Sequence, residues 1–486
     1  MENSSPIILA IDQGSGSTKA LAINLNGEVL TQLDVKIATT FPQPGWVEQD
    51  PEEIWQSVVT ASKEITKAHK ISAVGLSIQR ESVLLWDRKT GKALSKIITW
   101  QDRRASEIAA KQAKNAAQVK AISGLELDPM FSALKAQWLF ENNDYQGADL
   151  CIGTIDSWIA FKLGAGHIVE AGSASRTQLL DIQTGQWSPE LLSIFGIPEN
   201  QLPRVCSSNE KLNCTNMEAL GLTNDIPLSG IMGDSHAALF AHQGWKTGYF
   251  KATFGTGTSL MGLTETNPQT VAWVLDQNIT RAAEANILST GSTLVWLAEL
   301  LGTTPDELAK LAPESAQVVE LVPAFNGLGA PWWDREATGI IAGLTRGSSR
   351  ADLAAAALRS TAAQINDVLE DFAKSNVKIE TLYADGGGAR NQYLMQMLAD
   401  LSGKKIKSSQ LLELSAFGAA MVAALGAGLA TLSDIEKIEL KYDEYLPKIS
   451  EPERQERLKT WRKALLAARG KNQTKLYSAL SKRPKI

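Results

Sequence analysis

Cysteine is scarce in this chain, and long apolar runs are missing. Only Cys151, Cys206 and Cys214 occur among the 486 residues, too few and too unevenly placed for a disulfide framework or a zinc site. The alanine-rich run 416–430 is too short to span a membrane and is typical of a buried helix. Residues 1–5 are polar and lack the basic segment and cleavage pattern of a signal peptide. We therefore expect a cytoplasmic protein without a membrane partner.

No excess of basic charge is present either. Lysine and arginine total 48 against 53 aspartates and glutamates, which gives a net charge of −5, and 44% of the residues are hydrophobic. Nucleic acid is therefore not expected as the main partner. The stretch 454–485 is locally basic, but the helical spacing of Leu458, Trp461 and Leu465 favours a solvated amphipathic helix over a binding arm.

Two buried strands are expected at the start of the chain, at residues 7–11 and 20–25. Asn26-Gly27 is a strong hairpin signal, so a third strand should begin near Val29. The glycine-rich segment between the first two strands is therefore the turn of a hairpin.

That turn, residues 12–19, reads DQGSGSTK. Its small residues allow backbone N–H groups and hydroxyls to approach a phosphate, and Asp12 can hold a magnesium ion through water. It is not a Walker motif, because Thr18 precedes Lys19 and strand-like residues follow where a helix would be needed. A plain tight turn, with Asp12 in an Asx-turn, is the alternative.

A second turn of the same design lies near the middle of the chain. Residues 248–261 again combine a strand, the Gly/Thr/Ser turn at 255–259 and an apolar continuation. A chain of 486 residues exceeds what one core usually supports. Two turns, one in each half, therefore suggest two related domains that grip one polyphosphate, with the boundary at residues 244–248.

Strands and helices alternate along the rest of the sequence. Asp50 should cap a helix that begins at Pro51. The other expected strands are 71–78, 228–232, 382–384 and a hairpin at 83–87 closed by the turn 89–91. The other expected helices begin at Arg103 or cover 235–242, 350–372 and 391–401.

Ten short motifs follow one another along nearly the whole chain. They are DQG (12–14), PGWVEQD (44–50), QRE (79–81), WQDRR (100–104), DPMFS (128–132), GD (233–234), FGTG (254–257), PAFNGLGAPWWD (323–334), GLTRG (343–347) and DGG (385–387). In this order they resemble the FGGY family of carbohydrate kinases, with the glycerol kinases as the nearest branch.

The resemblance implies an α/β fold of two ribonuclease-H-like domains, of the actin/hexokinase ATPase type, with ATP in a central cleft. The expected bounds are 6–246 for an N-terminal domain with the acceptor and the first phosphate turn, 247–450 for a nucleotide-binding domain, and 451–486 for a C-terminal helix and basic tail. We expect acceptor and ATP together to close the cleft. A homo-oligomer is compatible with this picture.

The implied activity is ATP-dependent phosphorylation of a hydroxyl of a small polyol or sugar, glycerol-kinase-like, with Mg²⁺ as cofactor. A ketopentose kinase acting on xylulose or ribulose is the alternative. An actin-like assembly protein would share the two turns, but it would lack a base such as Asp234 opposite Arg80 and Glu81. A chaperone ATPase would need a further peptide-binding domain.

The resemblance also assigns roles on the phosphate side. Asp234 is the general base that takes the hydroxyl proton, with a helix cap as its alternative role, and Asp12 is the magnesium-side carboxylate. The nucleotide-binding residues implied by the motifs are Ser15, Gly16, Ser17, Thr256, Gly291, Gly387 and Asn391.

On the acceptor side, Arg80 and Glu81 resemble the pair that donates to and accepts from a polyol's hydroxyls, with a surface ion pair as the alternative. Trp100 resembles the apolar wall beside the carbon chain. Glycerol kinases carry tyrosine at the position of Met130 and glutamine at the position of Ser235, so this chain loses two polar groups that contact the acceptor and gains space. The acceptor therefore stays open between glycerol, a longer polyol and a ketose. His236, beside Ser235, is either a replacement contact or a structural residue.

Overall fold

The computed structural model describes residues 5–143, 145, 149–246, 248–325, 327–375 and 377–469. The chain forms two compact units. Unit 1 contains residues 1–243, 267–282 and 413–439, and unit 2 contains residues 244–266, 283–412 and 440–486. Two segments that the sequence-based ranges put with the C-terminal half thus belong to unit 1. The predicted basic tail from residue 470 onward lies outside the described residues.

The centre of unit 1 is a five-stranded sheet with the order β13-β5-β1-β2-β3. The strands are β1 (Ile7–Gln13), β2 (Ser17–Asn24), β3 (Val29–Lys36), β5 (Ile71–Ile78) and β13 (Leu228–Gly233). β1 pairs antiparallel with β2 and parallel with β5. The predicted hairpin and third strand are confirmed, with Gly27 at φ 83° in the second turn.

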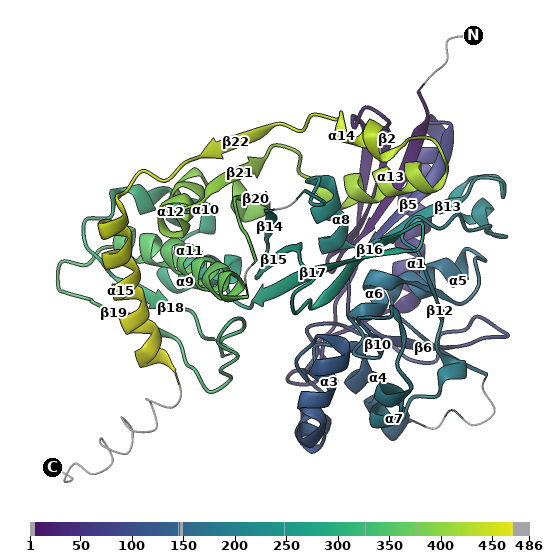
Figure 1. Cartoon of the computed structure of the whole chain (residues 1–486), viewed down its shortest axis with the longest axis horizontal. Helices are drawn as coiled ribbons and strands as arrows, with labels where there is room; N and C mark the ends of the chain where they lie inside the picture. The colour runs from purple at the N-terminus through teal and green to yellow at the C-terminus, as the bar shows by residue number, and fades with distance from the viewer. Residues whose placement is uncertain are drawn as a thin grey trace. The chain divides into compact units, whose positions relative to one another are not determined.

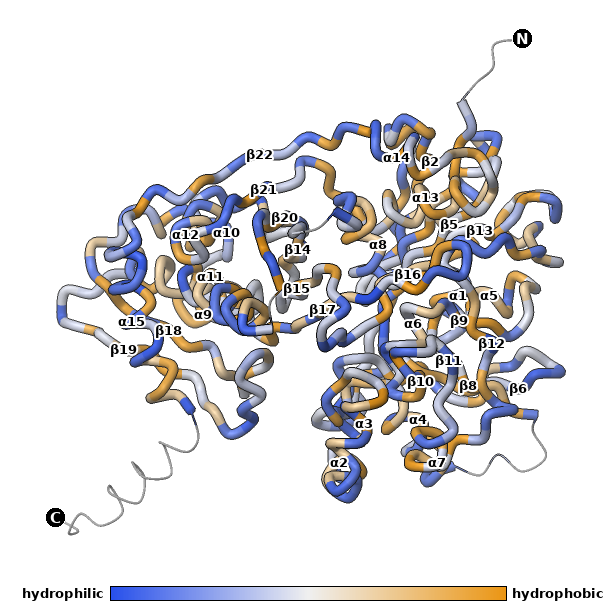
Figure 2. Tube along the Cα trace, viewed as in Figure 1, coloured by the Kyte–Doolittle hydropathy of each residue, from blue (hydrophilic) through white to orange (hydrophobic). Residues whose placement is uncertain are grey.

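Helices cover both faces of this sheet (Figure 1). Helix α1 (Pro51–Ala68), which the Asp50 side chain caps as predicted, shares a core cluster with Leu9 and Ile11 of β1. Because side chains alternate along a strand, Gly75 of β5 faces the other way, toward α13 (Leu414–Gly426). A Cβ atom on Gly75 would lie 2.4 Å from the Ala419 carbonyl oxygen, so glycine lets the apolar α13 pack close to the sheet (Figure 2).

The other regular elements of unit 1 surround this sheet and helix core. They are β4 (Glu48–Gln49), β6 (Leu84–Asp87), β7 (Ile97–Ile98), α2 (Ser106–Lys111), α3 (Ala116–Ser123), α4 (Ser132–Asn142), β8 (Leu150–Gly153), α5 (Ile155–Lys162), β9 (Ile168–Glu170), α6 (Ala171–Ser175), β10 (Leu180–Asp181), β11 (Gln186–Trp187), α7 (Pro189–Phe195), β12 (Arg204–Cys206), α8 (Asp234–Ala241), β16 (Thr270–Leu275) and α14 (Leu432–Glu436).

Two local predictions in unit 1 need correction. One is incomplete: the turn at 89–91 does close an antiparallel return, with backbone bonds from Asp87 to Lys92 and from Leu94 to Leu85, but the strand partner of β6 is β8. The helix expected from Arg103 begins at Ser106, since the Arg103 carbonyl still accepts turn bonds from the Ser106 backbone and side chain. The expected elements 71–78, 228–232 and 235–242 correspond to β5, β13 and α8.

Unit 2 is built on a sheet in which β15, β14, β20, β21 and β22 are neighbours in this order. Its elements are β14 (Tyr249–Phe254), β15 (Thr258–Leu263), α9 (Gly291–Leu301), α10 (Pro305–Leu311), β18 (Glu320–Val322), β19 (Ile340–Ala342), α11 (Arg350–Lys374), β20 (Thr381–Gly386), α12 (Gln392–Ser402), β21 (Lys405–Ser409), β22 (Tyr442–Tyr445) and α15 (Glu451–Ala468), while β17 (Asn278–Ile287) begins in unit 1 and ends in unit 2. The predicted helices 350–372 and 391–401 and strand 382–384 are confirmed as α11, α12 and β20.

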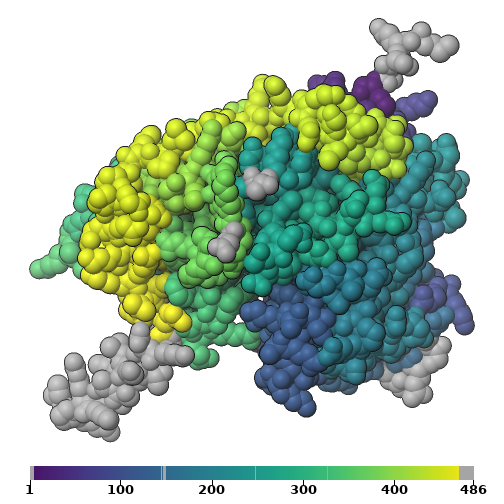
Figure 3. Space-filling view, in the orientation of Figure 1, coloured from purple at the N-terminus to yellow at the C-terminus, as the bar shows by residue number. Residues whose placement is uncertain are grey.

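Helix α15 lies on the outside of unit 2 (Figure 3). Leu458, Trp461 and Leu465 are buried, and Leu466 is exposed, so the amphipathic pattern predicted for this helix is confirmed. Within the part of the chain that the structure describes, no helix has both the length and the apolar character needed to cross a bilayer.

Candidate active site

The first phosphate turn of the sequence prediction is the connection between β1 and β2. Ser15 and Gly16 lie in this turn, and Ser17 begins β2. The buried side chain of Gln49 donates to the Ser15 carbonyl at 2.7 Å and accepts from Gln79 at 3.0 Å. A Cβ atom on Gly16 would meet nothing within 4 Å, so open space lies beside the turn.

Asp12 is the last residue but one of β1 and is partly buried. Its Oδ1 accepts a hydrogen bond from Ser77 Oγ at 2.7 Å. Burial raises the pKa of this carboxyl to about 6, and the negative charge of Asp234 adds to the rise. The bond from Ser77 opposes it. Asp12 is therefore held from the neighbouring strand β5, and no Asx-turn is needed to explain its position.

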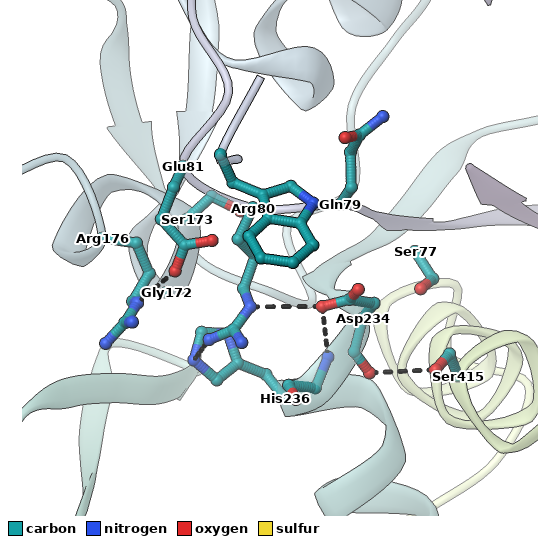
Figure 4. A network of polar contacts seen from close by, with 12 residues as sticks. Ser77, Gln79, Arg80, Glu81, Gly172, Ser173, Arg176, Asp234, His236 and Ser415 are labelled. Atoms are coloured by element: carbon teal, nitrogen blue, oxygen red, sulfur yellow. Dashed lines mark hydrogen bonds and ion pairs between the residues drawn. The ribbon is translucent and has the colours of Figure 1, made fainter. Parts of the chain in front are cut away.

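Asp234 stands where β13 passes into α8, as predicted, and forms an ion pair with Arg80 (Figure 4). Arg80 Nε donates to Asp234 Oδ1 at 3.2 Å, and the Ser235 backbone N–H donates to the same oxygen at 2.6 Å. The Asp234 side chain is 42% exposed, whereas that of Arg80 is 6% exposed. Both of these donors bond Oδ1, so Oδ2 takes part in neither bond.

Gly233 makes room for the Arg80 side chain at this junction. A Cβ atom there would lie 2.4 Å from Arg80 Cδ, so any larger residue would push the guanidinium away from Asp234. The two residues of the GD motif thus have separate structural roles. Asp234 places a carboxylate at the helix start, and Gly233 leaves space for the arginine beside it.

Glu81 follows Arg80, with its backbone at φ 64°, a conformation uncommon outside glycine. Two bonds hold it there. Ser132 Oγ donates to its carbonyl oxygen at 2.8 Å, and the buried Arg176 donates through Nε to Oε1 at 2.7 Å. Arg80 and Glu81 therefore direct their charges at different partners, and both side chains are buried, so the alternative of a surface ion pair at the strand end is wrong.

Two further predicted residues, Trp100 and Met130, lie in backbone segments that one lysine connects. Trp100 follows β7, is half-buried, and donates its indole N–H to Ser15 Oγ at 3.0 Å. Met130 precedes α4, and its carbonyl oxygen accepts from Lys135 Nζ at 2.6 Å. The same buried ammonium donates to the Thr99 carbonyl at 3.0 Å, and burial lowers the pKa of Lys135 to about 7. One lysine thus joins the two backbone segments that carry Trp100 and Met130.

In unit 2, Thr256 lies in the turn between β14 and β15, and Gly291 begins α9. The Thr256 carbonyl accepts backbone bonds from Thr290 and Ser292, both at 3.1 Å. A Cβ atom on Gly291 would lie 2.3 Å from the Gly255 carbonyl oxygen. The second predicted turn and the start of α9 are therefore packed against each other, backbone to backbone.

Gly387 and Asn391 stand between β20 and α12. Asn391 is the cap of α12, and its Oδ1 accepts from the Leu394 N–H at 2.9 Å. Gly387 is exposed, and a Cβ atom there would meet nothing within 4 Å. Gly386, at φ 84°, presses against the Phe254 backbone at the end of β14. Glycine turns from three parts of the chain thus lie close together in unit 2.

The structure brings Arg80, Glu81, Asp234 and Asp12 to neighbouring strand ends of one sheet. Sequence reasoning missed the residues that support them, chiefly Arg176, Lys135 and the glutamines at 13, 49 and 79. A lysine among the apolar residues of the stretch that forms α4 was one available signal, since Lys135 is fully buried. No comparable signal marks Arg176, which follows a run of small residues.

Comparison with known proteins gives matches over most of the chain. Residues 7–241 match the N-terminal domain of the FGGY family of carbohydrate kinases, and residues 250–427 match its C-terminal domain. A glycerol kinase from Bdellovibrio bacteriovorus is 40% identical over 492 residues, covering 95% of this chain and 99% of that protein.

Solved structures agree in fold. Plasmodium falciparum glycerol kinase with ADP has a TM-score of 0.89 and 28% identity, and the match covers 96% of this chain and 98% of that one. A ligand-bound xylulose kinase from Lactobacillus acidophilus has a TM-score of 0.86 at 22% identity, with 96% and 99% covered, and shows likeness of fold.

Proposed function

The chain belongs to the FGGY family of carbohydrate kinases, and on this premise we propose that it transfers the terminal phosphoryl group of ATP to a hydroxyl of glycerol or a polyol of similar size. The chain is an ATP-dependent kinase of a small polyol or sugar, and the choice of glycerol is the proposal. The observation that carries it is the Arg80–Asp234 ion pair beside Glu81 in unit 1. The 40% identical glycerol kinase supports the choice of acceptor.

The acceptor's hydroxyls would meet complementary groups at the ends of β5 and β13. Arg80 can only donate hydrogen bonds, and an ionised Glu81 can only accept them. Arg176 occupies Glu81 Oε1, so Oε2 remains for a hydroxyl that donates. Trp100 and Met130 would supply the apolar contacts to the carbon chain.

Asp234 would act as the general base. As the acceptor oxygen forms its bond to the γ-phosphorus, its proton passes to Asp234 Oδ2, and the bond from the γ-phosphorus to the β,γ-bridging oxygen breaks to release ADP. Arg80 and the Ser235 N–H hold Oδ1, which keeps the carboxylate in one orientation during the transfer.

Phosphate and nucleotide contacts are proposed for each unit separately. In unit 1, Ser15, Gly16 and Ser17 would offer hydroxyls and backbone N–H groups to phosphate oxygens. In unit 2, Thr256 and the N-terminus of α9 at Gly291 would do the same. Gly387 and Asn391 would hold the adenosine, next to the exposed start of α12.

Magnesium fits the carboxylate of Asp12. Among the described residues, no group of three or more His, Cys, Asp or Glu side chains could hold a metal by itself. Mg²⁺ in kinase sites usually takes one or two carboxylates, its own waters and the nucleotide phosphates, so a single carboxylate is sufficient. When bound, the ion would neutralise phosphate charge. Burial raises the pKa of Asp12 to about 6, so the carboxylate is available to a cation at neutral pH.

A cytoplasmic location is also proposed. Cys151, Cys206 and Cys214 are all free and buried, as is common for proteins of a reducing compartment.

An ATP-consumption screen tests the proposal. Purified enzyme with Mg²⁺ is assayed against glycerol, longer polyols, xylulose and ribulose, with Asp234→Asn as the blank. We expect the highest kcat/KM with glycerol. A preference for a ketopentose would select the alternative, which the loss of polar groups at Met130 and Ser235 keeps open. No turnover with any alcohol would refute the kinase proposal.

A further inference from the structure

His236 makes contacts that a residue near a helix start does not need. It is the third residue of α8, two after Asp234, and its side chain is 0% exposed. Its Nε2 lies 3.4 Å from Arg80 Nη1 and 2.9 Å from Thr270 Oγ1. Figure 4 shows Arg80 extended between Asp234 and the His236 ring.

We propose that His236, held by Thr270, is a positioning residue that fixes the Arg80 guanidinium against Asp234. The inference rests on the proposed function, and it gives His236 a role through Arg80 and not through direct contact with the acceptor.

The donor and acceptor roles follow from chemistry. An arginine N–H can only donate, so the ring nitrogen that faces it must accept. The hydroxyl of Thr270 lies 2.9 Å from the same Nε2. Arg80 is thus held at two of its nitrogens, Nε by Asp234 and Nη1 by His236.

Thr270 comes from a part of the chain that returns to unit 1. It begins β16 in segment 267–282 and is fully buried. Its hydroxyl lies 3.0 Å from Ser175 Oγ, and Ser175 Oγ accepts from the Val271 N–H at 3.0 Å. Val271 and Val274 of β16 pack in one apolar cluster with Ala171 and Ala174 of α6. β16 thus supplies a fixed hydroxyl to the histidine.

The ring has little freedom to move. A Cβ atom on Gly172 would lie 2.9 Å from His236 Nδ1, so the start of α6 approaches the ring closely. A Cβ atom on Gly233 would lie at the same distance from the same nitrogen. A side chain of different shape at position 236 would remove one of the contacts that hold Arg80, and the bond from Arg80 to Asp234 would weaken.

Four variants test the inference, in two matched pairs: His236→Leu with His236→Gln, and Thr270→Val with Thr270→Ser. His236→Leu should raise the acceptor KM and lower kcat together, reducing kcat/KM about tenfold or more, while KM for ATP stays within twofold. Thr270→Val should act in the same direction by about threefold to tenfold. The glutamine and serine variants keep an acceptor or a hydroxyl and should recover most of the loss.

A double mutant separates positioning from general damage to the fold. If Thr270 acts only through His236, His236→Leu/Thr270→Val should be no worse than His236→Leu alone. Additive losses would overturn the inference, and so would an acceptor kcat/KM within threefold of wild type in the two non-polar variants. Melting curves report folding, and Thr270→Val carries the test if the leucine variant does not fold. Wild-type turnover is measured first. An inactive wild-type enzyme would contradict the proposed function and not the role of His236.

Discussion

The indole N–H of Trp100 donates to the hydroxyl oxygen of Ser15 across 3.0 Å. One of these residues is proposed to touch the acceptor, and the other lies in the turn proposed to touch phosphate. If Trp100 or Ser15 moves, their hydrogen bond transmits the movement to the other residue. We therefore expect binding of the acceptor and binding of phosphate to be coupled inside unit 1.

Trp100→Phe tests this link. Phenylalanine keeps an apolar wall but removes the N–H, so we expect KM for both ATP and the acceptor to rise about threefold to tenfold. Trp187→Phe is the matched control, because this variant also loses one indole hydrogen bond, to the Pro203 carbonyl at 2.8 Å. Steady-state kinetics measure both. Equal effects in the two variants would show that the link has no special role.

Asp234→Asn should remove the base while preserving the shape of the site. We expect kcat to fall about 10²-fold to 10⁴-fold, with nucleotide affinity, measured by calorimetry, nearly unchanged. Asp225→Asn, an exposed carboxylate of the same unit, serves as the control. Turnover within a few-fold of wild type would remove Asp234 from the role.

Met130→Tyr combined with Ser235→Gln should restore polar contacts on the acceptor side. We expect the ratio of kcat/KM for glycerol over that for xylulose to rise about tenfold, since a site built to bond a hydroxyl discriminates better than an apolar one. Competition between the two acceptors in one reaction gives this ratio directly. A flat or falling ratio would mean that these residues do not contact the acceptor.

Gly16→Ala and Gly387→Ala probe the two nucleotide contacts without disturbing the fold. A methyl group at either place meets nothing within 4 Å, so stability should stay within about 0.5 kcal/mol of wild type. KM for ATP should nevertheless rise about tenfold if the nucleotide approaches closely. Gly339→Ala, with ordinary contacts at 3.5 Å, is the control in unit 2. Unchanged ATP kinetics in Gly387→Ala would show that the adenosine does not bind beside Gly387.

The carboxyl of Asp12 predicts an unusual pH dependence. Burial raises its pKa from 3.8 to about 6. Ionisation of Asp12 therefore costs the folded state no stability below pH 3.8. The cost in free energy of unfolding grows as the pH rises toward 6 and is complete above 6. Asp12→Asn should thus increase stability by about 1–3 kcal/mol at pH 8, and by less at pH 5.

The same residue should be needed for activity in its ionised form. Wild-type kcat/KM for ATP should therefore decline below about pH 6, and Asp12→Asn should be nearly inactive although more stable. Denaturant titrations at both pH values and a pH–rate profile measure the two effects. If Asp12→Asn is less stable than wild type at pH 8, the ionised Asp12 carboxylate does not destabilise the folded state, and the assignment is wrong.

The first glycine turn and the place of Asp234 could be predicted because their signals are local, whereas the roles of the other site residues come from the resemblance of the motifs. The strand, the glycine turn and the following strand at residues 7–24 lie within one short stretch of sequence. Asp234, directly after β13, is likewise marked by the residues next to it. Each needs only the alternation of apolar residues and a change of pattern at glycine.

The supporting residues could not be predicted, because they reach the site across long distances in sequence. Arg176 is 95 positions from Glu81, and Thr270 is 34 positions from His236. Nothing in the sequence near Arg176 says that a carboxylate will lie beside it. The return of 267–282 and 413–439 to unit 1 is likewise decided by tertiary packing, which local patterns do not contain.

The segments that form unit 1 are translated at widely separated times. Residues 413–439 include α13, whose backbone lies against Gly75 and Gly230 of the central sheet. A ribosome will therefore have made all the strands of that sheet, and most of unit 2, before the helix that covers one of its faces has left the exit tunnel. During translation this face stays exposed, and its apolar residues depend on chaperones or on rapid completion of the chain to escape aggregation.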